Sequence, residues 1–199
     1  MTDVKAFVQA RMSSSRFPGK VLAPFRGEPI VLHVVRAVGT AVGDANVVVA
    51  TSDEPSDDPL AAYLDSVGVA CFRGPRDDVL QRFRLCAERY PSEWIVRICA
   101  DSPLLDPGVV RAVVDAAAGD VDVVSTAIAG SAKGTNAELV RTSALFAVDL
   151  AETTAEDREH VMPFFYRHPE RYRLRGVDVP IRDVGTVDTV DDLKRLEAS

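Results

Sequence analysis

The amino-acid sequence predicts an α/β fold: a three-layer sandwich with a mostly parallel central sheet and helices on both faces, formed by residues 1–199 as one domain. Three observations support this prediction. Strand-like and helix-like segments alternate along the chain, and several strand-like segments are short β-branched runs typical of strands buried on both faces. At 199 residues, with 47% hydrophobic and 27% charged residues, the chain can bury one substantial core, and it contains no internal repeat or long linker.

The predicted strands follow one another at intervals filled by helical segments. They are VKAFVQA (4–10), NVVVAT (46–51), VACF (69–72), EWIVRICA (93–100), VDVVS (121–125) and AELVRT (137–142). Because helices separate successive strands, parallel pairing is favoured throughout the first 125 residues.

The predicted helices are bounded by ordinary start and stop signals. They cover 29–38, 57–68, 77–90, 106–120 and 143–152, followed by a final helix after Thr189. Gly68 stops the second helix, Pro107 lies near the first turn of the fourth, and Asp77 and Asp78 suit the first turn of the third. A further helix is expected to bury Val161, Phe164 and Phe165.

Charge and composition exclude several function classes. A net charge of −7 and a pI near 5.0 disfavour binding to nucleic acid or to an anionic membrane, since both partners reward a basic surface. No apolar run approaches the roughly 20 residues that span a bilayer, so a cytoplasmic protein is expected. Cys71, Cys86 and Cys99 lie in apolar segments and are predicted to be reduced core residues.

The stretch QARMSSSRFPGK (9–20) places three cations and three serines directly after the first predicted strand. Sheets of this class bind ligands beyond the carboxyl ends of their strands, which is where this loop lies. Arg11, Arg16 and Lys20 could converge on phosphate oxygens, while Gly19 lets the backbone approach. The loop matches neither the P-loop nor the G-x-G-x-x-G pattern, so a solvated basic loop and a phosphate cradle both remain open on these residues alone.

Two carboxylates also have two interpretations each. Asp101 follows the strand EWIVRICA and is expected at the same sheet edge, although an Asp before Ser-Pro also suits a simple turn. Asp188 stands just before Thr189, which could cap the final helix with help from Asp191 and Asp192.

The order of these motifs resembles a known family. The loop ARMSSSRFPGKVL resembles the signature loop of the cytidylyltransferases that make CMP-sugars, in particular the spore-coat-polysaccharide group and the related CMP-KDO synthetases. VVVATSDEPSDDPLAAYLDSVGVACFRGPRDDVLQRF, VRICADSPLLDPGVV, EDREHVMPFFYRHPERYRL and VGTVDTVDDLKRL resemble successive blocks of the same family, so the likeness covers nearly the whole chain.

The resemblance implies a Rossmann-like nucleotide-diphospho-sugar transferase fold, of the GT-A-like kind, and an enzyme of polysaccharide biosynthesis. It implies transfer of CMP from CTP to a sugar acid or related cell-surface sugar, with release of pyrophosphate. Asp101 and Asp188 would bind Mg²⁺, the cofactor, and Arg16 and Lys20 would act on the phosphates in catalysis. The other residues implied to bind the nucleotide are Arg11, Ser14, Ser15, Gly19, Arg73, Gly74 and Asp78.

The acceptor side departs from the family pattern. Where relatives commonly carry G-x-D-x-E, this chain has GTNAEL, so Gly134 and Glu138 match while Asn136 replaces the Asp. Asn136, Glu138 and His160 are predicted to bind the acceptor, which is expected to be small and anionic. A phosphonate or phosphorylated polyol is an alternative acceptor, a catalytically idle nucleotide-binding protein is an alternative of another class, and a homodimer is a possible assembly.

Overall fold

A computed structural model of the chain describes residues 2–130, 136–179 and 185–198. In these ranges the main sheet has seven strands in the order β5-β4-β1-β6-β8-β7-β9. The strands are β1 (Val4–Gln9), β4 (Val47–Ser52), β5 (Ala70–Gly74), β6 (Trp94–Cys99), β7 (Val123–Ser125), β8 (Glu138–Arg141) and β9 (Leu174–Gly176). This mostly parallel sheet confirms the predicted α/β class, and each strand predicted from the sequence is present.

Strand direction decides which residues reach the functional edge. β1 pairs in parallel with β4 and β6, β4 with β5, and β7 with β9, whereas β8 runs antiparallel to both of its neighbours, β6 and β7. The carboxyl ends of β1, β4, β5 and β6 therefore meet at one edge, and β8 begins at that edge instead of ending there. Residues just after the parallel strands and at the start of β8 are brought together.

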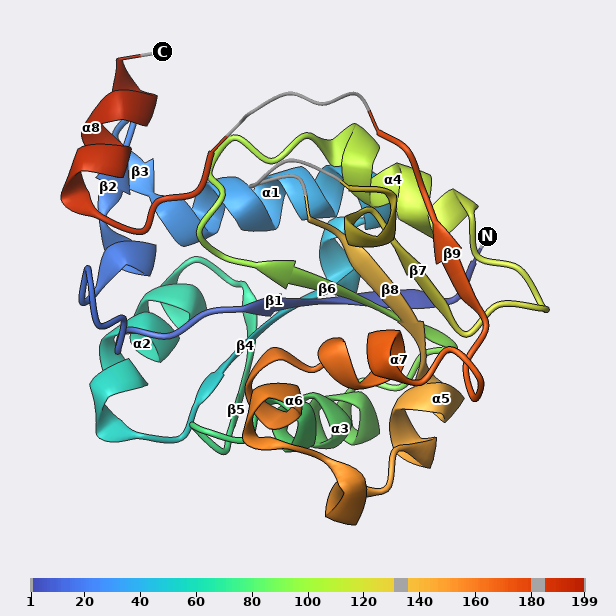
Figure 1. The fold of residues 1–199 in the computed structure, drawn as a ribbon. Helices are drawn as coiled ribbons and strands as arrows, with labels where there is room; N and C mark the ends of the chain where they lie inside the picture. Colours follow the sequence, from blue (N-terminus) through green and yellow to red (C-terminus); the bar gives the residue numbers. More distant parts are fainter. Residues whose placement is uncertain (1, 131–135, 180–184, 199) are drawn as a thin grey trace.

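Helices cover both faces of the sheet, as predicted (Figure 1). They are α1 (Ile30–Val42), α2 (Asp58–Ser66), α3 (Val79–Arg89), α4 (Pro107–Asp115), α5 (Thr142–Ala147), α6 (Ala155–His160), α7 (Pro163–Arg167) and α8 (Val190–Glu197). Side chains alternate along each strand, so neighbouring residues enter different cores. Val8 of β1 packs in the core shared by α1, α2 and α4, whereas Phe7 packs in the core shared by α3, α5 and α7.

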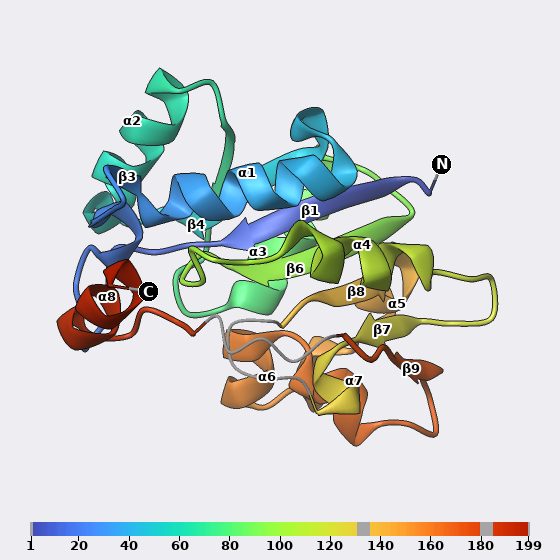
Figure 2. The same ribbon diagram turned by 90° about the horizontal axis from the view of Figure 1, so that it is seen from above.

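A third, small apolar cluster holds the C-terminal helix. Leu196 of α8 packs with Phe25, Ile30 and Val187 at one end of the molecule (Figure 2). Phe25 belongs to a short antiparallel hairpin of β2 (Pro24–Phe25) and β3 (Glu28–Pro29), turned by Arg26 and Gly27, which both have positive φ. The prediction of parallel pairing throughout the first 125 residues is therefore wrong for this hairpin.

Three predicted helices have different limits, and one of them, predicted at 106–120, already ends at Asp115. The helix predicted at 29–38 runs on through Gly39 to Val42 and ends at Gly43, whose φ of 90° is accessible to glycine. The predicted 143–152 helix ends at Ala147, and Asp149 then caps a separate 3-10 turn over Leu150–Glu152.

The helix expected around Val161 is two helices, α6 and α7. Pro163 cannot continue an α-helix, and Val161 between the two has a φ of 67°, which is strained for a β-branched residue.

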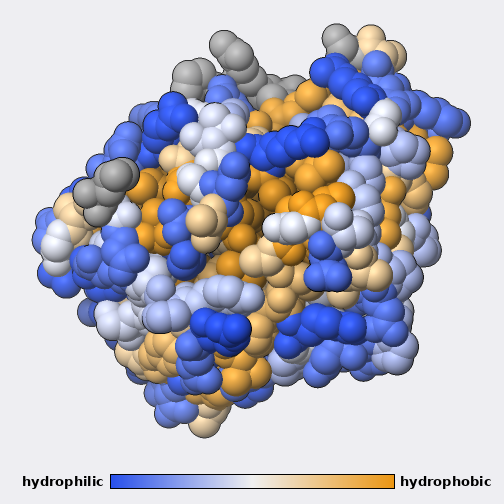
Figure 3. All heavy atoms as spheres, turned by 180° about the vertical axis from the view of Figure 1, so that it is seen from behind, coloured by the Kyte–Doolittle hydropathy of each residue, from blue (hydrophilic) through white to orange (hydrophobic). Residues whose placement is uncertain are grey.

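The surface opposite to Figure 1 is mixed in polarity (Figure 3). On the face opposite to Figure 1, hydrophilic residues interrupt the apolar areas (Figure 3). Within the described ranges no helix combines the length and apolarity that a membrane span requires. All three cysteines are free, as predicted, but only Cys86 is fully buried in a core: Cys71 is partly buried and packs against the core edge, and the partly buried Cys99 borders the functional edge instead of a core.

Candidate active site

The basic loop after β1 closes on the backbone of Met12. The Met12 carbonyl accepts hydrogen bonds from the N–H groups of Ser14, at 3.0 Å, and Gly19, at 2.8 Å. Gly19 has a φ of +76°, a left-handed conformation that favours glycine, and this turn directs the chain into the 3-10 turn that begins at Lys20. The loop is therefore a defined turn that presents Arg16 and Lys20 on one side.

A buried carboxylate fixes the start of this loop, and the sequence analysis missed it. Asp57 is fully buried and accepts hydrogen bonds from the N–H of Met12 at 2.7 Å, the hydroxyl of Thr51 at 2.9 Å, and both the N–H (3.0 Å) and the hydroxyl of Ser52. Burial alone would raise the pKa of Asp57, but these donors outweigh it and hold the pKa below its usual range. The ionised side chain ties the basic loop to β4.

Asp101 and Asp188 meet at the end of Lys20. The Lys20 ammonium lies 3.1 Å from Asp101 Oδ2 and 3.0 Å from Asp188 Oδ1, and Arg16 Nη2 lies 3.0 Å from Asp188 Oδ2. A backbone bond from Val187 N–H to the Asp101 carbonyl, 2.8 Å long, joins the two segments. Burial opposes ionisation of Asp188, but the hydrogen bond and charge of Lys20, with Arg16, lower its pKa. Thr189 and Asp192 form the predicted capping box of α8, which leaves Asp188 outside the cap.

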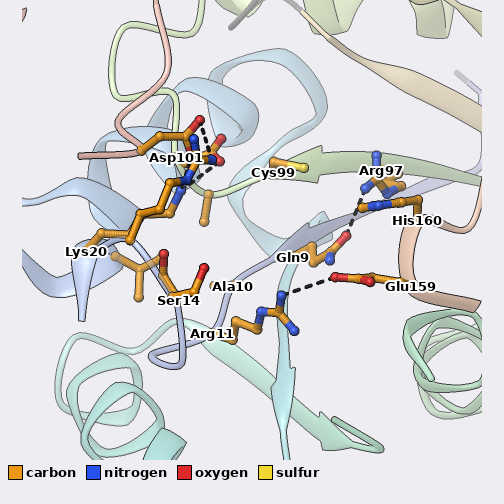
Figure 4. Close-up of a pocket in the computed structure, with 15 residues that line it drawn as sticks. Gln9, Ala10, Arg11, Ser14, Lys20, Arg97, Cys99, Asp101, Glu159 and His160 are labelled. Atoms are coloured by element: carbon orange, nitrogen blue, oxygen red, sulfur yellow. Dashed lines mark hydrogen bonds and ion pairs between the residues drawn. The ribbon is translucent and has the colours of Figure 1, made fainter. Parts of the chain in front are cut away.

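One cavity of about 290 Å³ opens at this edge (Figure 4). Eight of the predicted residues line it: Arg11, Ser14, Ser15, Arg16, Lys20, Asp101, His160 and Asp188. Lys20 and Asp101 lie at one end of the cavity, and Arg97 and His160 lie at the other, with Gln9 and Cys99 between them (Figure 4). The basic loop and the two carboxylates thus share one cavity: Asp101 was expected there from its position after a strand, and Asp188 from the family resemblance.

Three residues predicted on the nucleoside side have contacts elsewhere and are not among those that line this cavity. Arg73 donates to the carbonyls of Ser52 (3.0 Å) and Glu54 (2.8 Å) and pairs with Asp58. Gly74 is buried against Arg82, whose Cγ would lie 3.1 Å from an added Cβ. Their roles toward the nucleotide stay predictions.

Asp78, the third of these residues, caps α3 by accepting from Gln81 N–H at 2.9 Å and pairs with Arg158 at 2.5 Å. This confirms the helix-start interpretation of Asp78 and leaves its nucleotide role untested. Arg82, one turn further along α3, is fully buried, and its three guanidinium nitrogens have no hydrogen-bond partner among the described residues.

The predicted acceptor residues separate into three places. His160 lines the main cavity, whereas Asn136 is exposed and lines a second cavity of about 150 Å³ with Ser102 and Thr186. Gly134 lies outside the described residues. Glu138 lines neither cavity: it is buried, with Arg97 at 2.5 Å from Oε2 and the Tyr166 hydroxyl at 2.5 Å from Oε1. Both carboxylate oxygens of Glu138 are thus hydrogen-bonded to protein groups, and its contact with the acceptor stays a prediction.

Arg97 and Cys99 are lining residues that the sequence analysis missed. Both lie in β6 and border both cavities, as does Asp101. The available signal was Arg97 itself, a lone cation inside the apolar run WIVRICA, since a cation in a buried strand needs partners. Burial raises the pKa of the Cys99 thiol despite the attraction of Arg97, so the thiol stays neutral.

The carboxylate pair suits a hard divalent cation. Mg²⁺ is usually held by one or two carboxylates together with phosphate oxygens and water, and not by an all-protein cage. Asp101 and Asp188 already hold one positively charged atom, Lys20 Nζ, between them at 3.0–3.1 Å. The described residues contain no group of three or more His, Cys, Asp or Glu side chains arranged for a metal ion.

Comparison with known proteins agrees with this site. A profile of the cytidylyltransferase family matches residues 6–193. The spore coat polysaccharide biosynthesis protein SpsF of Bacillus subtilis is 33% identical over 210 residues, which cover 100% of this chain and 86% of that protein. The 3-deoxy-manno-octulosonate cytidylyltransferase of Anaeromyxobacter sp. is 34% identical over 185 residues, covering 91% of this chain and 70% of its own length.

Solved structures give the same result for the fold. A cytidylyltransferase from Leptospira borgpetersenii superposes with a TM-score of 0.90 at 29% identity, covering 100% of this chain and 86% of that one. A CMP:2-keto-3-deoxy-manno-octonic acid synthetase complexed with CTP has a TM-score of 0.77 at 17% identity, covering 99% and 98% of the two chains, and shares the fold. The resemblance stated from the motifs is confirmed: the chain belongs to the cytidylyltransferase family and is a CTP-dependent nucleotidyltransferase.

Proposed function

We propose that this enzyme transfers CMP from CTP to a hydroxyl of a sugar acid, with Mg²⁺ as cofactor and pyrophosphate as the second product. The observation that carries the proposal is the convergence of Arg16, Lys20, Asp101 and Asp188 on one end of one cavity. Cations for a triphosphate and carboxylates for a divalent cation are the two groups that nucleotidyl transfer needs side by side.

The reaction forms one bond and breaks another at the α-phosphorus of CTP. The acceptor oxygen attacks, a P–O bond to the acceptor forms, the bond to the β-phosphate bridging oxygen breaks, and the hydroxyl proton is released. Negative charge therefore builds on the α-phosphate and on the departing pyrophosphate. A divalent cation held by Asp101 and Asp188 would neutralise part of that charge and lower the pKa of the acceptor hydroxyl.

The basic loop would hold the leaving pyrophosphate. The Lys20 ammonium has three N–H donors. Two of them donate to Asp101 and Asp188, so the third is available to a phosphate oxygen. Arg16 has a side chain that is 65% exposed and can turn its planar fork from Asp188 to two phosphate oxygens. Ser14 and Ser15 supply further donors from the same loop, and Arg11, paired with Glu159 at 3.3 Å, braces its far side.

The sugar-acid class follows from relatives and from residue type. The 3-deoxy-manno-octulosonate cytidylyltransferase of Anaeromyxobacter sp., 34% identical over 185 residues, is named for a sugar acid. Asn136, at the second cavity, carries no charge that would repel an anion and can donate a hydrogen bond to one. Because the enzyme would consume CTP, a cytoplasmic location fits the proposal. The assembly into a homodimer stays a prediction.

A pyrophosphate-release assay tests the proposal. The enzyme is incubated with CTP, UTP, ATP or GTP, with and without Mg²⁺, across a panel of sugar acids, phosphonates and phosphorylated polyols. We expect release only with CTP, Mg²⁺ and an acceptor. Release with a phosphonate or phosphopolyol alone would replace the sugar-acid class, and CTP binding without turnover of any acceptor would favour the idle nucleotide-binding protein.

Variants connect the activity to the site. Asp101→Asn and Asp188→Asn should each lower kcat at least tenfold, about 1.4 kcal/mol of transition-state stabilisation. The matched control is Asp191→Asn, which removes the same charge three residues from Asp188 at a side chain that is 95% exposed. Wild-type rates in both site variants would contradict the assignment of the carboxylates.

A further inference from the structure

Four neighbouring strands contribute one polar side chain each to a hydrogen-bonded row at the functional edge. Gln9 of β1 accepts from Arg97 Nη2 of β6 at 3.0 Å, and Arg97 Nη1 donates to Glu138 of β8 at 2.5 Å. The Tyr166 hydroxyl of α7 lies 2.5 Å from Glu138 Oε1 and 3.0 Å from the hydroxyl of Ser125 in β7. Arg97, Glu138 and Ser125 are direct partners in the strand register, so the sheet itself aligns the row.

This row is buried in a part of the sheet that is otherwise apolar. The Arg97 side chain is 11% exposed and that of Glu138 is 8% exposed. Burial and the Glu138 charge raise the pKa of Tyr166, so its hydroxyl keeps its proton and donates to the carboxylate. Glu138 and Gln9 thus hold two of the three guanidinium nitrogens, and Arg97 is fixed before any ligand arrives.

The small exposed part of Arg97 faces the cavities. Arg97 borders both the main cavity and the second cavity, beside His160 in the first and Asn136 in the second. In the main cavity it lies at the end away from Lys20 and Asp101 (Figure 4). The triphosphate cations and the metal carboxylates are therefore at one end, and a second, preset cation is at the other.

Arg97 also has N–H groups that no acceptor in the described part of the chain occupies. Nη1 and Nη2 carry two N–H groups each and each has one acceptor here, so each keeps one N–H for a ligand, whereas Nε, which has no partner among the described residues, is buried and out of a ligand's reach. A guanidinium with free N–H groups recognises a planar carboxylate through paired hydrogen bonds. Residues predicted for the nucleoside, such as Arg73, lie toward β5 and α3 on the far side of β1, so the β6 and β8 side is left for the acceptor.

We propose that Arg97 is the specificity-determining residue for the acceptor, binding its carboxylate, and that Glu138 and Tyr166 are positioning residues that hold Arg97 for this task. The inference rests on the proposed function and deepens it, because it names the group of the substrate that the enzyme requires. The guanidinium is already immobilised, so little side-chain entropy is lost on binding. An acceptor without a carboxylate leaves these N–H groups without a partner and is rejected.

The test uses paired variants, because removing Arg97 alone would leave Glu138 buried without its cation. The variant is Arg97→Gln/Glu138→Gln, which keeps the row neutral and hydrogen-bonded. Arg97→Lys keeps the charge but loses the fork, and Arg111→Gln, on the exposed face of α4, is the control for loss of an arginine. Circular dichroism and the melting temperature establish that each variant is folded.

Two probes separate carboxylate recognition from general binding. They are 3-deoxy-manno-octulosonate and its analogue in which the carboxylate is reduced to an alcohol. In the wild type and in Arg111→Gln we expect a kcat/KM at least 100-fold higher for the carboxylate. In the double variant this ratio should fall at least tenfold through a raised acceptor KM, with KM for CTP within twofold of wild type. Arg97→Lys should give an intermediate ratio.

Calorimetry with CTP and Mg²⁺ distinguishes failure of this inference from failure of the proposed function. If the wild type does not bind CTP, or releases no pyrophosphate with any acceptor, the proposed function is overturned. If CTP binds but the wild type turns over only uncharged or phosphonate acceptors, or no carboxylate at all, the carboxylate assignment is overturned. An unchanged ratio in the double variant, or an equal rise in KM for CTP and acceptor, would also overturn it.

Discussion

Asp57→Asn should both destabilise the protein and weaken CTP binding. The carboxylate uses Oδ1 for Met12 N–H and Oδ2 for three donors from Thr51 and Ser52. An amide has only one oxygen, so either the Met12 N–H or the Ser52 N–H must face an NH₂ group that cannot accept. The substitution therefore leaves at least one buried backbone donor without an acceptor, whichever way the amide turns.

The expected cost follows from these bonds. Losing a hydrogen bond to a charged group costs about 1.5–3 kcal/mol, and an unsatisfied buried donor costs about 1–3 kcal/mol. We expect the free energy of unfolding to fall by roughly 3 kcal/mol, a large share of the 5–15 kcal/mol typical of native proteins. Because Met12 anchors the basic loop, KM for CTP should rise at least fivefold.

Urea denaturation followed by circular dichroism measures the stability, and pyrophosphate release measures KM. Asp65→Asn, a change of the same kind at an exposed position of α2, the helix that Asp57 precedes, is the control. The pKa of Asp57 lies below its usual range, so its stabilisation is present above about pH 4 and is lost as the pH falls through the lowered value. The gap between wild type and variant should narrow below pH 4. A variant within 0.5 kcal/mol of wild type, or a KM shift no larger than that of the control, would refute the reasoning.

Three further substitutions are expected to change stability or activity, one of them by stabilising the protein. Arg82→Met should raise the free energy of unfolding. Burial lowers the pKa of Arg82 to about 10 from 12.5, so the buried charge destabilises the folded protein by roughly 3 kcal/mol at neutral pH. Urea denaturation that shows equal or lower stability of the variant would contradict this. Gly19→Ala has room for its Cβ, 3.4 Å from Met12 Cε, but should cost about 1–2 kcal/mol at a φ of +76° and raise KM for CTP, so an unchanged KM would show that this turn does not shape the cradle. Asn136→Asp should lower kcat/KM at least fivefold for an anionic acceptor and less for a neutral analogue, because a charge about 5 Å away repels an anion by roughly 3 kcal/mol before screening; equal losses for both would defeat the idea.

The meeting of Lys20 with Asp101 was predictable because each follows a parallel strand, and such strands end at one edge. Asp188 was assigned by resemblance, since nothing in its local sequence separates it from an ordinary residue before a capped helix. Asp57 could not be identified, because DEPSDDPL offers several acids and only the packed turn buries this one. Sequence spacing shows which residues share an edge, but not which side chains turn inward.

The acceptor side was less accessible for the same reason. Glu138 was recognised as a motif residue, but its task depends on Arg97 and Tyr166, which come from a different strand and a helix. Arg97 was hidden inside an apolar strand pattern whose periodicity was the stronger signal. The break between α6 and α7 was also missed, because the spacing of Val161, Phe164 and Phe165 outweighed Pro163.

³¹P nuclear magnetic resonance of the complete reaction tests the central claim most directly. The enzyme is mixed with CTP, Mg²⁺ and 3-deoxy-manno-octulosonate, and the phosphorus signals are followed in time. Transfer of CMP predicts that the three signals of CTP are replaced by one phosphodiester signal and one pyrophosphate signal, and that Asp101→Asn slows this change at least tenfold. Appearance of CDP with a phosphorylated acceptor, or CTP signals that stay unchanged while calorimetry shows CTP and Mg²⁺ bound, would contradict it.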